Sequence, residues 1–160
     1  MAIEIEHKFL LRDDRWRQRV ERSVSMRQGY LISDARRSVR VRVAGAQGFL
    51  NIKSGTLGIQ RSEYEYAIPL AEAEEILNTL CEQPLLEKTR HFVRCDDHLW
   101  EIDEFAGANA GLIVAEVELH YPDEPFTRPD WAGEDVSHDI RYYNSQLARH
   151  PYNTWSCASD

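Results

Sequence analysis

Ionisable and apolar side chains alternate along residues 3–10, and this alternation constrains the fold more than any other feature of the chain. Successive side chains of a β-strand point to opposite faces. Glu4, Glu6 and Lys8 would therefore share one face of a strand. The other face would carry Ile3, Ile5, His7 and Phe9. Two carboxylates about 7 Å apart can hold a hard divalent cation, and Lys8 adds positive charge for an anion that the cation also contacts. A charged face in water is the simpler explanation of one such strand, so the interpretation depends on whether later strands repeat the pattern.

Later segments do repeat it, and the chain contains about eight predicted strands. Besides residues 3–10, strands are predicted at 26–31, 38–43, 49–53, 60–68, 86–95, 99–105 and 112–120. Residues 70–80 have an apolar stripe typical of an amphipathic helix, and a final helix is predicted at about 141–149. Residues 13–22 fit a short helix or an irregular connection equally well.

The charged residues are grouped by strand. Acidic pairs occur at Glu4/Glu6, Glu63/Glu65, Glu101/Asp103 and Glu116/Glu118. Basic pairs occur at Arg40/Arg42 and Lys88/Arg90, with Lys8, Lys53 and Arg61 as single residues. If the sheet closes with these faces inward, the interior is wet and charged, the reverse of an ordinary small barrel. Buried charges need partners, and a polyanion with divalent cations would supply both signs.

Composition narrows the possible partners and the location. The net charge is −8 and the pI about 5.3, which argues against binding to nucleic acid or an anionic membrane. No apolar run approaches the ~20 residues of a membrane helix, so we expect a cytoplasmic protein. The length suits one domain, residues 1–155, with a tail at 156–160. The three cysteines are far apart and form no zinc-binding pattern.

An ordered set of motifs resembles the CYTH domain, or triphosphate tunnel metalloenzyme, family. Glu4-Ile5-Glu6-His7-Lys8 matches the ExExK signature of that family, and the resemblance runs from residue 3 to about 149. The later matching motifs are Gln28-Gly29-Tyr30-Leu31, Val39-Arg40-Val41-Arg42, Lys53-Ser54, Arg61-Ser62-Glu63-Tyr64-Glu65, Glu87-Lys88-Thr89-Arg90, Trp100-Glu101-Ile102-Asp103-Glu104-Phe105, Glu116-Val117-Glu118 and Asp139-Ile140-Arg141-Tyr142-Tyr143-Asn144. His7 departs from the Arg or Lys usual in close relatives, but we expect it on the outward face.

The resemblance implies a mostly β fold: an eight-stranded antiparallel closed barrel, or tunnel, with a charged lumen and a few flanking helices. Residues 141–149 would be a C-terminal helix that plugs one end. The chain looks most like short bacterial members that hydrolyse inorganic tripolyphosphate to pyrophosphate and phosphate. The resemblance also implies Mg²⁺ or Mn²⁺, as two ions, and a metal-activated water as the nucleophile.

The resemblance, together with the charge pattern, assigns roles to the inward residues. The expected metal ligands are Glu4, Glu6, Glu116 and Glu118, while Glu63, Glu65 and Asp103 either ligate metal or orient arginines. The expected phosphate-binding residues are Lys8, Arg40, Arg42, Lys53, Lys88 and Arg90. Lys8 and Tyr30 are candidates for handling a proton, although Tyr30 fits a packing role equally well. Arg61 lies near a turn and fits a surface role equally well.

Several alternatives share this scaffold. A class IV adenylate cyclase, a thiamine triphosphatase and a non-catalytic binding module for polyphosphate or organic phosphate all stay open. Both acidic pairs disfavour the binding module, because an anion binder needs bases more than metal ligands. The expected partner in every case is a small phosphate compound, and the sequence leaves open whether the protein is a monomer or a homodimer.

Overall fold

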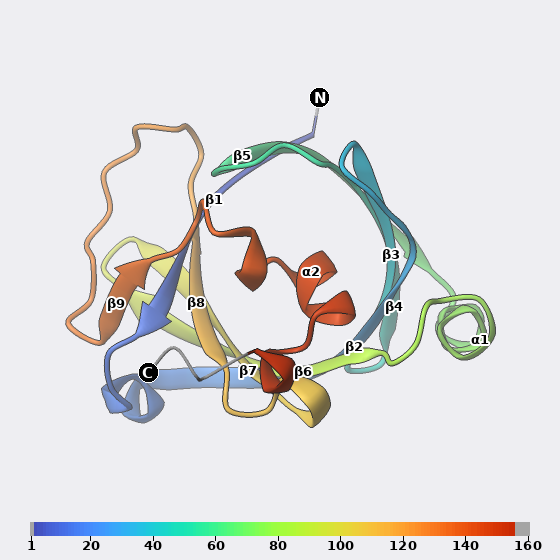
Figure 1. Ribbon diagram of the computed structural model, residues 1–160. Helices are drawn as coiled ribbons and strands as arrows, with labels where there is room; N and C mark the ends of the chain where they lie inside the picture. The colour runs from blue at the N-terminus through green and yellow to red at the C-terminus, as the bar shows by residue number, and fades with distance from the viewer. Residues whose placement is uncertain (1, 156–160) are drawn as a thin grey trace.

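A computed structural model describes residues 2–155 and shows a ring of strands with one helix outside it and one inside it (Figure 1). The strands are β1 (Ile3–Leu11), β2 (Val20–Ser33), β3 (Arg37–Ala44), β4 (Gln47–Ser54), β5 (Gln60–Ile68), β6 (Leu86–Cys95), β7 (His98–Phe105), β8 (Ile113–Glu118) and β9 (Ala132–Asp135). The α-helices are α1 (Leu70–Thr79) and α2 (Asn144–Arg149), and 3-10 turns occupy Arg15–Arg19, Gly107–Asn109, Ile140–Tyr142 and Tyr152–Thr154. The predicted tail at 156–160 lies outside the described residues.

Eight antiparallel strands close into a barrel, which confirms the predicted fold. Their order is β5-β4-β3-β2-β6-β7-β8-β1, and pairing of β5 with β1 completes the ring. This closing contact is short, because only residues 3–5 of β1 pair with β5. Further along the same edge of β1, Phe9 and Leu11 pair with β9 instead. β9 was not predicted, since its four residues lie in a proline-containing stretch without a long alternating pattern.

Apolar side chains cover the outside of the barrel in two places. α1 packs on the outer face of β3 and β4, where Leu77 joins a buried cluster with Val41. On the other side, Trp16 and Trp131 join a cluster around Trp100 on the outer faces of β1, β6, β7 and β8. The prediction that apolar faces point outward is confirmed. Only α1 is a helical cover, however, because the other cluster is covered by a 3-10 turn and the connection before β9.

Two predicted segments differ most from the observed elements. β2 begins at Val20 rather than Met26, and it pairs with β6 over most of that extra length, where alternation in the sequence is weak. The predicted final helix is divided into a 3-10 turn and the short helix α2. Tyr143 separates them, because its backbone is extended, with φ −72° and ψ 138°.

The C-terminal helix α2 lies inside the ring of strands in Figure 1, so the predicted plug is confirmed. Leu147 of α2 is fully buried, in one apolar cluster with Leu86, Phe105 and Val114. One part of the barrel interior is therefore apolar and filled by the plug, which leaves the charged part as the candidate site. No helix among residues 2–155 combines the length and apolarity needed to span a membrane.

We predict that Gly48→Ala destabilises the protein, because α1 is pressed closely onto β4. A Cβ atom on Gly48 would lie 2.7 Å from the Cβ of Ala73 and 3.1 Å from the carbonyl oxygen of Ile68. Such overpacking costs about 1–3 kcal/mol of unfolding free energy, measurable by urea denaturation. In a double-mutant cycle, Ala73→Gly should reduce the cost of Gly48→Ala. Purely additive effects would contradict this account of the contact.

Candidate functional site

A cavity of ≈ 190 Å³ in the barrel is lined almost entirely by polar and ionisable side chains. The lining residues are Glu4, Glu6, Lys8, Tyr30, Ser38, Arg40, Arg42, Lys53, Gly58, Arg61, Glu63, Glu65, Arg90, Glu101, Glu116, Glu118, Ser137, Tyr143, Asn144 and Ser145. Every predicted site residue except Lys88 and Asp103 is in this set. The alternating pattern of the sequence thus identified the correct face of each strand.

Strand register places acidic residues directly opposite one another on one wall. Glu6 of β1 pairs with Glu118 of β8, and Glu101 of β7 pairs with Glu116 of β8. Like charges directly opposite on one face are destabilising. Burial, followed by the charges of Glu116 and Glu4, raises the pKa of Glu6 well above its usual range. Burial and the charge of Glu4 likewise raise the pKa of Glu118. This acidic wall therefore has more carboxyl groups than the neighbouring cations can hold ionised.

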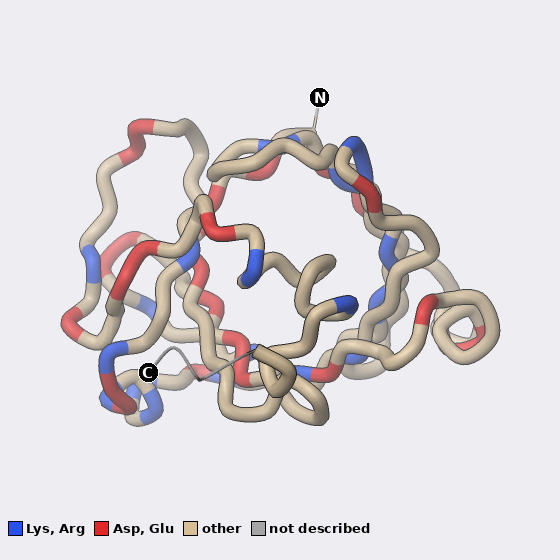
Figure 2. Tube along the Cα trace, in the orientation of Figure 1, with Lys and Arg blue, Asp and Glu red and all other residues tan. Residues whose placement is uncertain are grey.

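The opposite wall is basic. β3 lies four places from β8 in the eight-strand ring and carries Arg40 and Arg42, which are both buried. Within residues 2–155, neither guanidinium has a carboxylate at ion-pair distance; Arg42 Nε donates instead to Gln28 Oε1 at 2.9 Å. Burial, and then the charges of Arg40 and Arg90, lower the pKa of Arg42 to about 9. Figure 2 shows the blue bands along β3 facing red bands along β8 across the ring.

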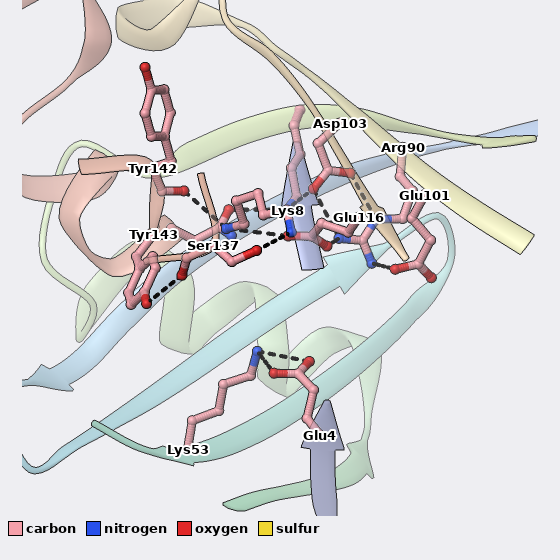
Figure 3. Close-up of polar contacts among 12 residues, drawn as sticks. Glu4, Lys8, Lys53, Arg90, Glu101, Asp103, Glu116, Ser137, Tyr142 and Tyr143 are labelled. Carbon is pink, nitrogen blue, oxygen red and sulfur yellow. Dashed lines mark hydrogen bonds and ion pairs between the residues drawn. The ribbon is translucent and has the colours of Figure 1, made fainter. Parts of the chain in front are cut away.

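Other cations in the cavity pair with individual carboxylates (Figure 3). Lys53 Nζ lies 3.1 Å from Glu4 Oε1, and Lys8 Nζ lies 3.3 Å from Glu116 Oε2. Burial opposes ionisation of Glu4 and Glu116, but their cationic partners outweigh it. As a result the pKa of Glu4 is lowered, and Lys8 and Arg90 lower the pKa of Glu116 to about 2. These pairs hold both carboxylates ionised in the cavity.

Asp103 lies behind the cavity wall and has no solvent exposure. Its carboxylate accepts from Lys88 Nζ at 2.7 Å and from Arg90 Nε at 2.8 Å (Figure 3). Although burial favours the neutral acid, Arg90 and Lys88 hold the pKa of Asp103 well below its usual range. Of the two predicted roles for Asp103, the geometry fits orientation of basic residues. The amine of Lys88 also donates to Asn144 of the plug at 3.1 Å, so Lys88 links the wall to α2.

The plug contributes residues that the sequence analysis did not identify. The hydroxyl of Tyr143 donates to the Ser137 carbonyl at 2.9 Å and accepts from the Gly58 amide at 3.1 Å. Arg61 and Lys8 lie over the Tyr143 ring, 4.8 Å and 5.5 Å from its centroid. Neither Ser137 nor Tyr143 was given a site role from the sequence: Ser137 lies in irregular chain, and Tyr143 lies in the predicted final helix and in a motif that resembles the family. Arg61 could have been assigned from the sequence, because it is two positions from Glu63 and therefore shares the inward face of β5 with it.

The predicted pairing of Lys8 with Tyr30 stays a prediction. Lys8 Nζ donates to the Tyr142 carbonyl oxygen at 3.0 Å and pairs with Glu116. Tyr30 lines the same cavity from β2, where it is opposite Arg40 of β3. Glu63 and Glu65, the other second-choice ligands, accept from the amide of Asn51 at 3.0 and 3.3 Å.

The carboxylates of the acidic wall have the donor chemistry that a hard divalent cation requires. Among residues 2–155, no three acidic, histidine or cysteine side chains form a preassembled metal site. Magnesium does not need one, since it keeps several waters and binds one or two carboxylates beside substrate phosphates. The opposed pair Glu6 and Glu118 offers oxygen ligands that have no ion-pair partner within residues 2–155, and a bound cation would favour their ionised form, so the residues present fit such a cation.

Comparison with known proteins agrees with the fold. Residues 2–152 match the CYTH domain family. An inorganic triphosphatase of Acetivibrio thermocellus is 45% identical over 97% of this chain and 99% of its own length. An inorganic triphosphatase of Nitrosomonas europaea is 37% identical over 91% of this chain and 96% of its own. The crystal structure of the inorganic triphosphatase NE1496 superimposes with a TM-score of 0.65 at 36% identity, covering 92% of this chain and 95% of that one.

We predict that Asp103→Asn lowers the unfolding free energy by about 3–5 kcal/mol, because it leaves the Lys88 and Arg90 charges without their shared partner. Glu104→Gln is a matched control on the next residue of β7. Glu104 faces outward and pairs with Arg17 at the surface, so its loss should cost about 1 kcal/mol or less. Chemical denaturation of both variants measures the difference. Equal effects would mean that Asp103 does not hold the basic residues in place.

Proposed function

Because this chain belongs to the CYTH domain family, we propose that its tunnel hydrolyses inorganic tripolyphosphate to pyrophosphate and phosphate with Mg²⁺ or Mn²⁺. The proposal rests on one observation: acidic residues on one wall of the cavity and basic residues on the opposite wall both lack ion-pair partners. Glu6 and Glu118 oppose each other on one side, and Arg40 and Arg42 have no carboxylate partner on the other within the described chain. A triphosphate accompanied by divalent cations supplies both missing charges.

We assign phosphate binding first to Arg40 and Arg42, whose planar guanidinium groups suit bidentate contacts with phosphate oxygens. Arg90, Lys53 and Lys8 add positive charge to the same cavity. Lys88 does not line the cavity, so we assign it to the support of Asp103 and of the plug. The charge on the equatorial oxygens of a transferring phosphoryl group spreads in the transition state, and preorganised cations stabilise it there.

We assign the metal to Glu4, Glu6, Glu116 and Glu118, with Glu63 and Glu65 as further oxygen ligands in the same cavity. A divalent cation held there would neutralise phosphate oxygens and lower the pKa of water. The chain itself orients these ligands. Lys53 fixes Glu4, and Lys8 fixes Glu116, so two carboxylates are held at set positions before the substrate enters.

Lys8 and Tyr30 are our candidates for proton handling. Burial disfavours a charge on Lys8, but Glu116 and Glu6 outweigh that effect and raise the pKa of its amine. Lys8 is therefore protonated at neutral pH, and its ammonium group is suited to donate a hydrogen bond to the oxygen of the leaving pyrophosphate. Tyr30 is buried in the cavity wall beside Arg40, where its hydroxyl can pass a proton or simply pack.

We predict that Glu118→Gln lowers kcat/KM for tripolyphosphate by about 100-fold or more, because glutamine keeps the size but removes the charge that a hard cation needs. The same change should raise the Tm of the metal-free protein, since the Glu118 carboxylate is repelled by Glu4 and Glu101. Phosphate release and thermal melts measure both effects, with the outward-facing Glu87→Gln as control. Near-normal turnover in folded Glu118→Gln protein would remove this residue from the metal site.

We predict a much higher kcat/KM for tripolyphosphate than for ATP or thiamine triphosphate, and no cyclic AMP. The cavity walls are charged, and the Tyr143 ring is already engaged by Arg61 and Lys8, so little surface is free to stack a base. A second groove of ≈ 340 Å³ shares Ser38, Arg61, Tyr143 and Ser145 with the cavity, and we expect an organic group attached to the triphosphate to lie there. Side-by-side assays with chromatography of the products test this expectation. Cyclic AMP with pyrophosphate would favour a cyclase, and equal efficiency on ATP would mean that the groove admits a nucleoside.

A further inference from the structure

Gln28 is a fully buried amide on the inward face of β2, directly opposite Arg42 of β3. Its Oε1 accepts from Arg42 Nε at 2.9 Å, and its Nε2 has no hydrogen-bond partner within residues 2–155. A buried amide that is only half satisfied is costly to keep, and an apolar side chain of the same size would remove that cost. The contact with Arg42 is therefore the feature that distinguishes this glutamine from an ordinary core residue.

The partner of Arg42 differs in kind from the partners of the other paired cations in the tunnel. Lys8 pairs with Glu116, Lys53 with Glu4, and Arg90 with Asp103, each through a carboxylate. Arg42 alone among these four is held by a neutral group. A neutral acceptor fixes the direction of the guanidinium without cancelling its charge.

We propose that Gln28 is a positioning residue that orients Arg42 for the substrate while leaving its positive charge unneutralised. The proposal rests on the proposed function, in which Arg42 binds a phosphate group. A glutamate at position 28 would fit the same space and form an ion pair with Arg42. That ion pair would neutralise the charge of Arg42 in the absence of substrate. It would also place a carboxylate beside an incoming polyanion and occupy the guanidinium group.

The expected signature of Gln28→Glu is therefore weaker anion binding without a loss of stability. Binding of tripolyphosphate is measured by calorimetry in EDTA, where turnover is suppressed, and Tm is measured without ligand. Gln28→Glu should weaken binding by about tenfold to hundredfold, as expected for a hydrogen bond to a charged group, and should leave Tm unchanged or raised. Gln28→Met, which removes the acceptor and adds no charge, should weaken binding less. Gln18→Glu makes the same charge change on the exposed outer surface and controls for net charge.

A double-mutant cycle separates this inference from the proposed function. If Gln28 acts through Arg42, Gln28→Met should weaken binding little further in an Arg42→Ala background. Unchanged binding in Gln28→Glu alone would overturn the inference, and so would a Tm below that of Gln28→Met. If Arg42→Ala itself binds tripolyphosphate normally, the phosphate role of Arg42 in the proposed function fails. The ligand-free Tm of Gln28→Glu would still test whether residue 28 pairs with Arg42.

Discussion

The whole structure depends on placing many ionisable side chains inside a barrel, where each charge must find a partner or destabilise the fold. Closing the sheet with its charged faces inward makes this possible because cross-strand neighbours supply partners. Arg90 and Lys88 of β6 meet Asp103 of β7, and Lys8 of β1 meets Glu116 of β8. The apolar faces then point outward and must be covered, so α1 and the tryptophan-rich cluster are needed for the same reason.

The pairing of charged side chains inside the barrel is incomplete. The ion pairs behind and between the walls hold the barrel together. Glu6, Glu118, Arg40 and Arg42, which have no ion pair within residues 2–155, face the cavity. A buried network in which every charge were matched would be more stable and would have little reason to take up a polyanion. The residual imbalance across ≈ 190 Å³ is thus the property that links stability to binding in this protein.

Strand alternation, with its period of two, predicted the charged face of each strand and so most of the cavity lining, whereas the closed barrel was implied by the resemblance to the CYTH family. Sequence could not show which charges pair, since that depends on register: Asp103 and Glu116 look alike along the chain, yet one lies behind the wall and the other lines the cavity. Sequence reasoning also missed β9 and Ser137, which lie where the chain has no periodic pattern, and it assigned Tyr143 no site role although this residue lies in a motif that resembles the family. The role of Arg61 was left open between the site and the surface, although the alternation along residues 60–68 places it on the same face as Glu63.

The short contact that closes the ring has a consequence for how the protein is made. β1 precedes its partners β5, β8 and β9 in the chain, and Glu118, which is opposite Glu6, is more than a hundred positions later. Contacts between such distant segments form slowly, because the entropy cost of closing a long loop comes before the contacts stabilise the chain. One edge of β1 therefore stays unpaired until β8 has been synthesised, and Glu4 and Glu6, the proposed metal ligands, meet Glu116 and Glu118 only after that. Slow folding and exposure of β1 to wrong strand partners follow from the same topology that builds the tunnel.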